Sequence, residues 1–65
     1  MDFINKLIDE CQRLEEYRDL MIEHDFTYDK VKNITNVYLN NIGLRNIKCK
    51  LFFLKKKGLY KRKSV

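Results

Sequence analysis

Basic side chains are the most informative functional groups of this sequence. Residues 30–65 carry eleven Lys and Arg and no Asp or Glu, whereas all nine acidic residues lie within residues 1–29. Lysine and arginine neutralise phosphates and release counterions, which supplies most of the non-specific affinity of a protein for nucleic acid. The split predicts a basic half that binds duplex DNA. Pairing of the acidic half with the basic half inside the molecule is compatible with the same pattern.

The candidate DNA contacts divide into base readers and phosphate contacts. Arg45 can pair with guanine and Asn46 with adenine, and both precede a predicted helix. Asn46 has an alternative role as the N-cap of that helix. A solvated face that keeps a small protein in solution is the alternative for the lysines. The expected phosphate footprint consists of Lys48, Lys50, Lys55, Lys56, Lys57, Lys61, Arg62 and Lys63.

Catalytic and metal chemistry finds little support in the sequence. His24 is the only histidine, so no Ser-His-Asp or Cys-His site can be assembled on firm ground. The gaps that separate Cys11, His24 and Cys49 match no zinc motif. The two glycines stand alone, so no phosphate-binding loop is present. We therefore expect neither an enzyme nor a protein that holds a metal or a cofactor.

Length and composition narrow the class of protein. A chain of 65 residues makes one small domain with a marginal core. The hydrophobic fraction of 45% is too high for a disordered chain, and no apolar run is long enough for a transmembrane helix. The N-terminus lacks the basic region of a signal peptide, and two cysteines are too few for a disulfide framework. A reduced, cytoplasmic protein is expected, and the richness in Ile, Asn and Lys favours a low-GC bacterium or its phage.

The first half must supply a scaffold. Within an acidic amphipathic segment, residues 1–25, we predict one helix over residues 2–24, with Asp2 as its cap. Its apolar stripe either packs into the core of the same chain or forms the seam of a homodimer. The seam would consist of Ile4, Leu7, Cys11, Leu14 and Met21.

The second half must position the cations. A helix is predicted over residues 29–40, capped by Thr27 or Asp29, and a further helix over residues 45–57. Gly43 marks the turn between them, and Gly58 suits a left-handed C-cap. A hairpin of residues 47–54 and 59–64 is the alternative, because Ile47 to Leu51 alternates as a strand does. The preferred fold is all-α, with three helices.

This order of elements resembles the helix-turn-helix motif of DNA-binding proteins. With Gly43 as the turn residue, the positions that such motifs keep apolar are occupied by Tyr38, Ile42, Leu44, Cys49 and Phe52. Leu39 stands where the motif usually has a small residue. Residues 54–63 are similar to the end of a winged helix-turn-helix recognition helix, with a leucine, three charged residues, Gly-Leu and a basic strand.

The resemblance covers about residues 28–63 and implies a basic helix-turn-helix half with a stunted or absent wing. Together with the charge split, it predicts a single domain over residues 1–65 that binds DNA as a phage or low-GC bacterial transcriptional regulator. The alternative is a small phage-type inhibitor that binds and redirects a host protein, such as a nucleic-acid enzyme. Attachment to a membrane surface through Leu59, Tyr60 and the basic tail is a third option.

Overall fold

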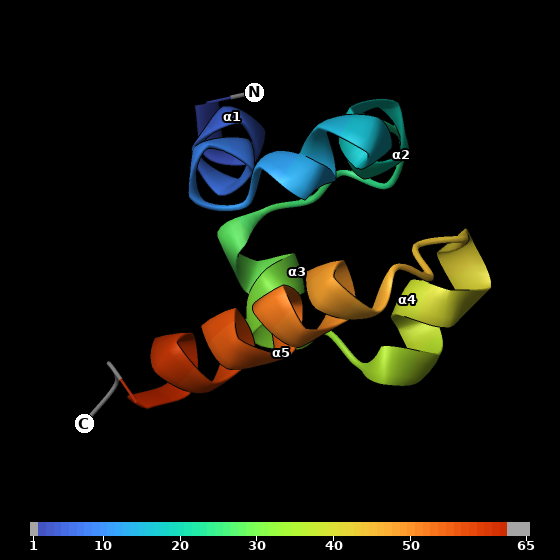
Figure 1. The fold of residues 1–65 in the computed structure, drawn as a ribbon. Helices are drawn as coiled ribbons and strands as arrows, with labels where there is room; N and C mark the ends of the chain where they lie inside the picture. Colours follow the sequence, from blue (N-terminus) through green and yellow to red (C-terminus); the bar gives the residue numbers. More distant parts are fainter. Residues whose placement is uncertain (1, 63–65) are drawn as a thin grey trace.

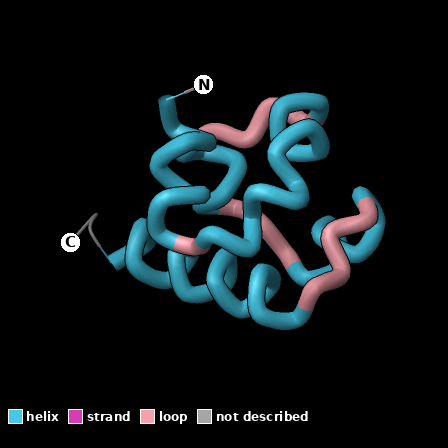
Figure 2. Tube along the Cα trace, turned by 45° about the horizontal axis from the view of Figure 1, so that its top comes forward, coloured by secondary structure: helices cyan, strands magenta, loops and turns pink. Residues whose placement is uncertain are grey.

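The computed structural model describes residues 2–62, and all their regular structure is helical. Its elements are α1 (Asp2–Glu10), the 3-10 helix η1 (Gln12–Tyr17), α2 (Arg18–Glu23), α3 (Tyr28–Lys32), α4 (Asn36–Ile42) and α5 (Ile47–Arg62). Figures 1 and 2 show α1, η1 and α2 as one layer that lies across α3 and α5. No strand occurs within residues 2–62, so the all-α prediction is confirmed. The hairpin alternative is wrong, because residues 47–62 form one helix.

The first segment is broken at Cys11, where one helix over residues 2–24 was expected. Cys11 has an extended backbone, with φ −144° and ψ 93°. An unbroken helix over residues 2–24 would be about 35 Å long at a rise of 1.5 Å per residue. That length exceeds the largest extent of the molecule, which is 33 Å. The break folds α1 back against η1 and α2, so that the apolar faces of all three reach one core.

The stripe proposed as a dimer seam lies inside a single chain. Ile4, Leu7, Leu14 and Met21 are 5%, 1%, 0% and 0% exposed, and Cys11 is half-buried against the same core. A buried side chain cannot form the surface of a second interface. This corrects the dimer-seam expectation and supports the intramolecular alternative. The stripe shares its core with Ile8, Phe26, Val31, Ile34, Leu39, Leu44, Cys49 and Phe53.

Residues 28–42 form two helices instead of the expected single helix over 29–40, and each begins at a threonine cap. The Thr27 Oγ1 accepts a hydrogen bond from the Lys30 N–H at 3.2 Å, and the Thr35 Oγ1 accepts one from the Tyr38 N–H at 3.1 Å. Thr27 is therefore the cap of α3. Between the helices, Ile34 is 2% exposed, so the break delivers one more apolar side chain to the core.

The turn at Gly43 is the feature that sequence predicted best in this half. Gly43 has φ 97°, a conformation that favours glycine. The Gly43 N–H bonds to the Asn40 carbonyl, and the Leu44 N–H reaches back to the Leu39 carbonyl at 2.9 Å. This is the hydrogen-bond pattern of a Schellman cap, in which the flanking apolar residues meet. Leu39 and Leu44 are both fully buried, so the turn fixes where α5 starts relative to α4.

Helix α5 is the longest element and extends beyond its expected end. It runs for sixteen residues and packs against α3 and α4, with Cys49 and Phe53 fully buried. Gly58 lies inside this helix, so its predicted role as a C-cap is wrong. Beyond Gly58, the Tyr60 ring stacks on Tyr28 with ring centroids 4.3 Å apart, a contact that favours continuation of the helix. None of the helices within residues 2–62 has the length and apolar character that crossing a membrane requires.

Candidate functional site

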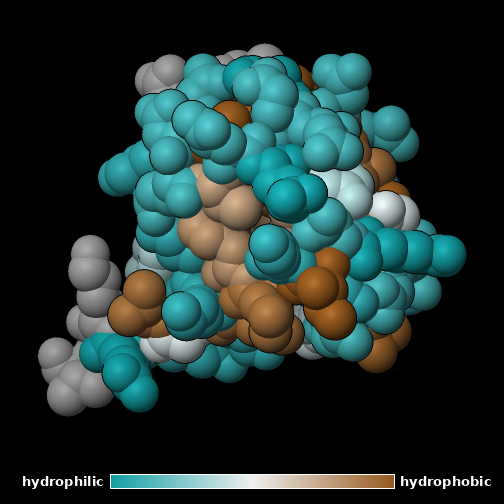
Figure 3. All heavy atoms as spheres, in the orientation of Figure 1, coloured by the Kyte–Doolittle hydropathy of each residue, from teal (hydrophilic) through white to brown (hydrophobic). Residues whose placement is uncertain are grey.

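The outward side of α5 carries large apolar side chains that the core leaves uncovered. Ile47, Leu51 and Leu59 are 68%, 57% and 55% exposed. Exposed residues of α5 recur three and four positions apart, so they share one side of the helix. Figure 3 shows hydrophobic surface over this part of the molecule, interrupted by hydrophilic atoms. We define the α5 face by its exposed residues Ile47, Lys48, Leu51, Lys55, Gly58, Leu59 and Arg62.

Cations on the α5 face lie between its apolar side chains. At about 100° per residue around the helix, Arg62 and Lys55 project at angles between those of Leu51 and Leu59. Lys48 projects in nearly the same direction as Lys55, about two helical turns nearer the start of the helix. No acidic residue occurs anywhere in α5. The face is therefore a mixed surface, apolar and basic together, instead of an apolar stripe with charged borders.

Only part of the predicted DNA footprint is presented to solvent. Lys57 is half-buried, and Lys63 lies outside the described residues. Lys50 and Lys56 have partners within the protein, as described below. The predicted cations that the structure leaves exposed are Arg45, Lys48, Lys55, Lys61 and Arg62.

Asn46 is the N-cap of α5, as its alternative interpretation predicted. Its Oδ1 accepts hydrogen bonds from the Lys48 N–H at 3.0 Å and the Cys49 N–H at 3.2 Å. Reading adenine would need the same oxygen together with the amide nitrogen. The oxygen bonds instead to the start of the helix, which favours the cap role of Asn46 over base reading.

Asn40 fixes two of the predicted cations at the turn between α4 and α5. Lys50 Nζ donates to Asn40 Oδ1 at 2.9 Å, and Arg45 Nε donates to the Asn40 carbonyl at 3.5 Å. Lys50 is half-buried and bonds to α4 across the turn, which removes it from the predicted phosphate contacts. Arg45 remains exposed beside it.

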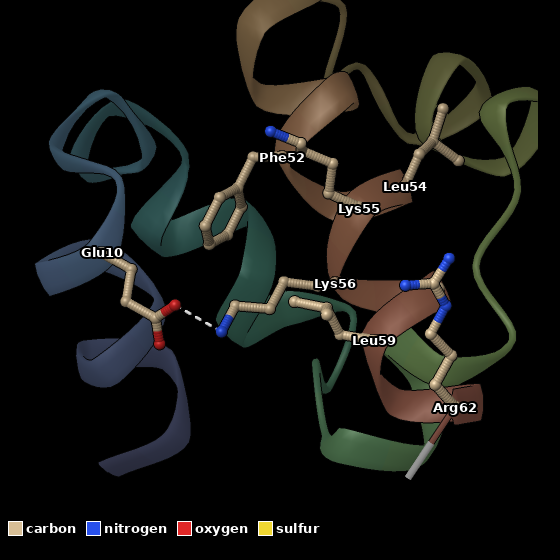
Figure 4. A pocket seen from close by; sticks show the side chains of 8 residues that line it. Glu10, Phe52, Leu54, Lys55, Lys56, Leu59 and Arg62 are labelled. Carbon is tan, nitrogen blue, oxygen red and sulfur yellow. Dashed lines mark ion pairs between the residues drawn. The ribbon is translucent and has the colours of Figure 1, made fainter.

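Lys56 joins the acidic half to the basic half. Its ammonium forms an ion pair with Glu10 of α1 (Figure 4), and its side chain is only 17% exposed. The Lys56 Nζ also lies 5.8 Å from the ring centroids of Phe52 and Tyr60. Intramolecular pairing of the two halves therefore occurs at this position. Lys56 stabilises the packing of α1 on α5 and is not a free phosphate contact.

A shallow hollow of about 520 Å³ opens on the α5 face around Gly58. Figure 4 shows side chains of α5 surrounding it, with Glu10 of α1 at one edge. The sequence pattern does not predict this hollow, because it places Gly58 at a helix end. The signal was present in the spacing of Lys55, Gly58, Leu59 and Arg62. The complete lining consists of Glu10, Phe52, Leu54, Lys55, Lys56, Gly58, Leu59 and Arg62.

Reactive groups are scarce within the described residues. Burial raises the pKa of the Cys49 thiol to about 11, and the adjacent Cys11 thiol adds to the shift. Such a thiol stays protonated near neutral pH and is a poor nucleophile. No group of three His, Cys, Asp or Glu side chains among residues 2–62 could hold a metal ion.

Comparison with known proteins gives no match. No family model, curated protein or solved structure is similar to this chain at a significant level. The resemblance to winged helix-turn-helix proteins stays a prediction, and the α5 face carries the functional argument.

Proposed function

We propose that this protein is a small interaction protein that binds a partner protein through the α5 face. The observation that carries the proposal is the set of three large apolar side chains, Ile47, Leu51 and Leu59, which are each more than half exposed on one side of the longest helix. Single exposed apolar residues are ordinary, but several on one side of one helix, interspersed with cations, favour an interaction surface. Interface cores are apolar and enriched in arginine, which suits a face that also carries Arg62.

The placement of the cations argues against a membrane surface as the partner. A helix that lies in a bilayer interface keeps its charges on the face opposite to its apolar side chains. Here Lys55 and Arg62 project between Leu51 and Leu59, so insertion of the leucines would carry both cations toward hydrocarbon. A protein surface can instead place a carboxylate opposite each cation and an apolar side chain opposite each leucine.

Duplex DNA is the second candidate partner, and the charge split favours it. The exposed cations Arg45, Lys48, Lys55 and Arg62 lie on or just before α5. The order of α4, the Gly43 turn and α5 also resembles the order of elements in a helix-turn-helix motif, in which the second helix reads DNA. Against this candidate, contact with phosphates would leave Leu51 and Leu59 without apolar partners.

Two double variants separate these functions. Leu51→Ser/Leu59→Ser removes apolar contacts and keeps every cation, whereas Lys48→Gln/Lys55→Gln removes cations and keeps the apolar side chains. All four positions are exposed, so we expect both variants to keep their fold, and circular dichroism checks this. The ligands are a displayed library of protein fragments and a short random-sequence DNA duplex.

Fragments that bind the wild type should bind neither variant, because the interface uses both apolar and basic side chains. Fragment binding that survives in the leucine variant would overturn it. Tight, salt-sensitive binding of the duplex that is kept by the leucine variant and lost by the lysine variant would instead establish the second candidate.

A further inference from the structure

We infer that the element docking on the α5 face is an acidic amphipathic helix of the partner, laid along α5 and centred on Gly58. The inference rests on the proposed function and names the chemistry of its partner. Three observations carry it: the spacing of the residues around the hollow, the glycine at its floor, and the charge of its rim.

The spacing around the hollow is that of a socket for a helix side chain. Lys55, Gly58, Leu59 and Arg62 occupy positions i, i+3, i+4 and i+7, the four residues that receive one knob when two helices pack together. Leu51, Leu54, Lys55 and Gly58 have the same spacing and form the socket before it. A helix that crosses α5 at a shallow angle would place successive apolar knobs in these two sockets. The hollow of about 520 Å³ is lined by the socket residues Leu54, Lys55, Gly58, Leu59 and Arg62, and by Glu10, Phe52 and Lys56 beside them.

Gly58 belongs to both sockets, and its lack of a side chain leaves space in each of them. A Cβ added at Gly58 would meet no atom of this protein within 4 Å. The backbone conformation there does not require glycine either, because Gly58 is helical and its φ is not positive. Glycine weakens the interior of a helix, so internal packing gives no reason for it at this position. Close approach by the side chains of another chain gives one.

The charge of the rim defines the polar character of the partner helix. Lys55 belongs to both sockets and Arg62 to one of them, and Lys48 continues the basic side of the face toward the start of α5. The one acidic residue of the lining, Glu10, is paired with Lys56 (Figure 4). A partner helix therefore gains most from Asp and Glu beside its apolar stripe. Arg62 can hold such a carboxylate with two parallel hydrogen bonds.

The acidic half of a second copy does not fit this description. Its apolar residues Ile4, Leu7 and Met21 are at most 5% exposed. The exposed large apolar side chains among residues 2–62 are Tyr28, Val37, Ile47, Leu51 and Leu59, and none of them belongs to α1, η1 or α2. That layer of a second copy could offer carboxylates to the α5 face but no exposed large apolar side chain.

The test begins with selection from a displayed library of helical peptides and continues with one selected peptide in fluorescence anisotropy. We expect the enriched peptides to carry apolar residues at three- and four-residue spacing with Asp or Glu beside them. Replacing those acids with Lys should abolish binding. Gly58→Ala should weaken binding at least about fivefold, because a methyl group fills the floor of both sockets. The matched control is Asn41→Ala, an exposed position on α4, which should leave the affinity unchanged.

Failure of the inference is distinguishable from failure of the proposed function. Enriched peptides without acids or without the helical apolar spacing, an unchanged affinity in Gly58→Ala, or no enrichment at all would overturn the inference. If such unexpected peptides bind the wild type but not Leu51→Ser/Leu59→Ser, the proposed function stands. Peptides that bind this leucine variant as well as the wild type would overturn both. Binding to anionic phospholipid vesicles, or self-association that Gly58→Ala abolishes, would assign the sockets to a different occupant and overturn the inference.

Discussion

Alanine at Gly43 and alanine at Gly58 should change stability in opposite directions. Gly43 has φ 97°, and an L-residue in a left-handed conformation costs about 1–2 kcal/mol. No atom lies within 4 Å of a Cβ built at Gly43, so the expected loss is conformational and carries no added clash. Gly58 lies inside α5 with equally open space around it, and alanine there should gain about 1 kcal/mol. For a domain of this size, 1 kcal/mol shifts Tm by about 4–8 °C.

Thermal melts followed by circular dichroism measure both shifts, and urea unfolding at one temperature checks the free energies. We expect Gly43→Ala to melt below the wild type and Gly58→Ala to melt above it. A lower Tm for Gly58→Ala would mean that Gly58 needs a left-handed conformation. In that case α5 ends there, the C-cap predicted from sequence is correct, and the sockets on the α5 face lose their basis. Equal melting of Gly43→Ala and the wild type would contradict the turn that joins α4 to α5.

Three further outcomes follow from the cap, the buried thiol and the ion pair. Asn46→Ala should lower the free energy of unfolding by about 1 kcal/mol in urea titrations, and unchanged stability would mean that Asn46 does not cap α5. Iodoacetamide at pH 8 should label each native chain once, at Cys11, because the Cys49 thiol is fully buried and has a pKa of about 11. Mass spectrometry measures the labelling, and equal labelling of both cysteines would contradict this. Glu10→Gln removes the charge opposite Lys56 and should lower the free energy of unfolding by about 0.5–1 kcal/mol. This loss should shrink at high salt, and a salt-independent loss would point to packing instead.

Local signals explain the parts of the fold that sequence predicted. The Thr27 cap, the Gly43 turn and the Asn46 cap each depend on a side chain or a backbone preference acting over three or four residues. Helical spacing of apolar residues likewise identified the all-α class. These features are properties of short segments, so a sequence is sufficient to find them.

Contacts between distant segments explain the parts that sequence did not predict. No Gly or Pro near Cys11 indicates the break in the helix there. The break follows from the need to bury two apolar faces in one small core. Gly58 and Gly43 are the same residue type, yet α5 stays helical past Gly58, where the stacking of Tyr60 on Tyr28 favours its continuation. The half-buried position of Lys56 depends on Glu10, which lies more than forty residues away in the chain.

Sequence predicted the charge of the candidate site but not its exposed apolar side chains. Sequence located the basic residues of α5 and assigned them to DNA. It did not show that Ile47, Leu51 and Leu59 face solvent, because helical spacing alone does not tell which side of a helix the core covers. That assignment depends on Cys49 and Phe53, which turn inward because they meet the other helices.

Whether the α5 face binds a partner protein is decided by the affinity of a selected protein fragment for the wild type and for Leu51→Ser/Leu59→Ser, with the Tm of both proteins recorded alongside. The account predicts that the variant melts near the wild type and loses binding by at least about tenfold, because two apolar contacts at an interface core are removed. Unchanged affinity in a folded variant would contradict the claim that the α5 face binds a partner protein.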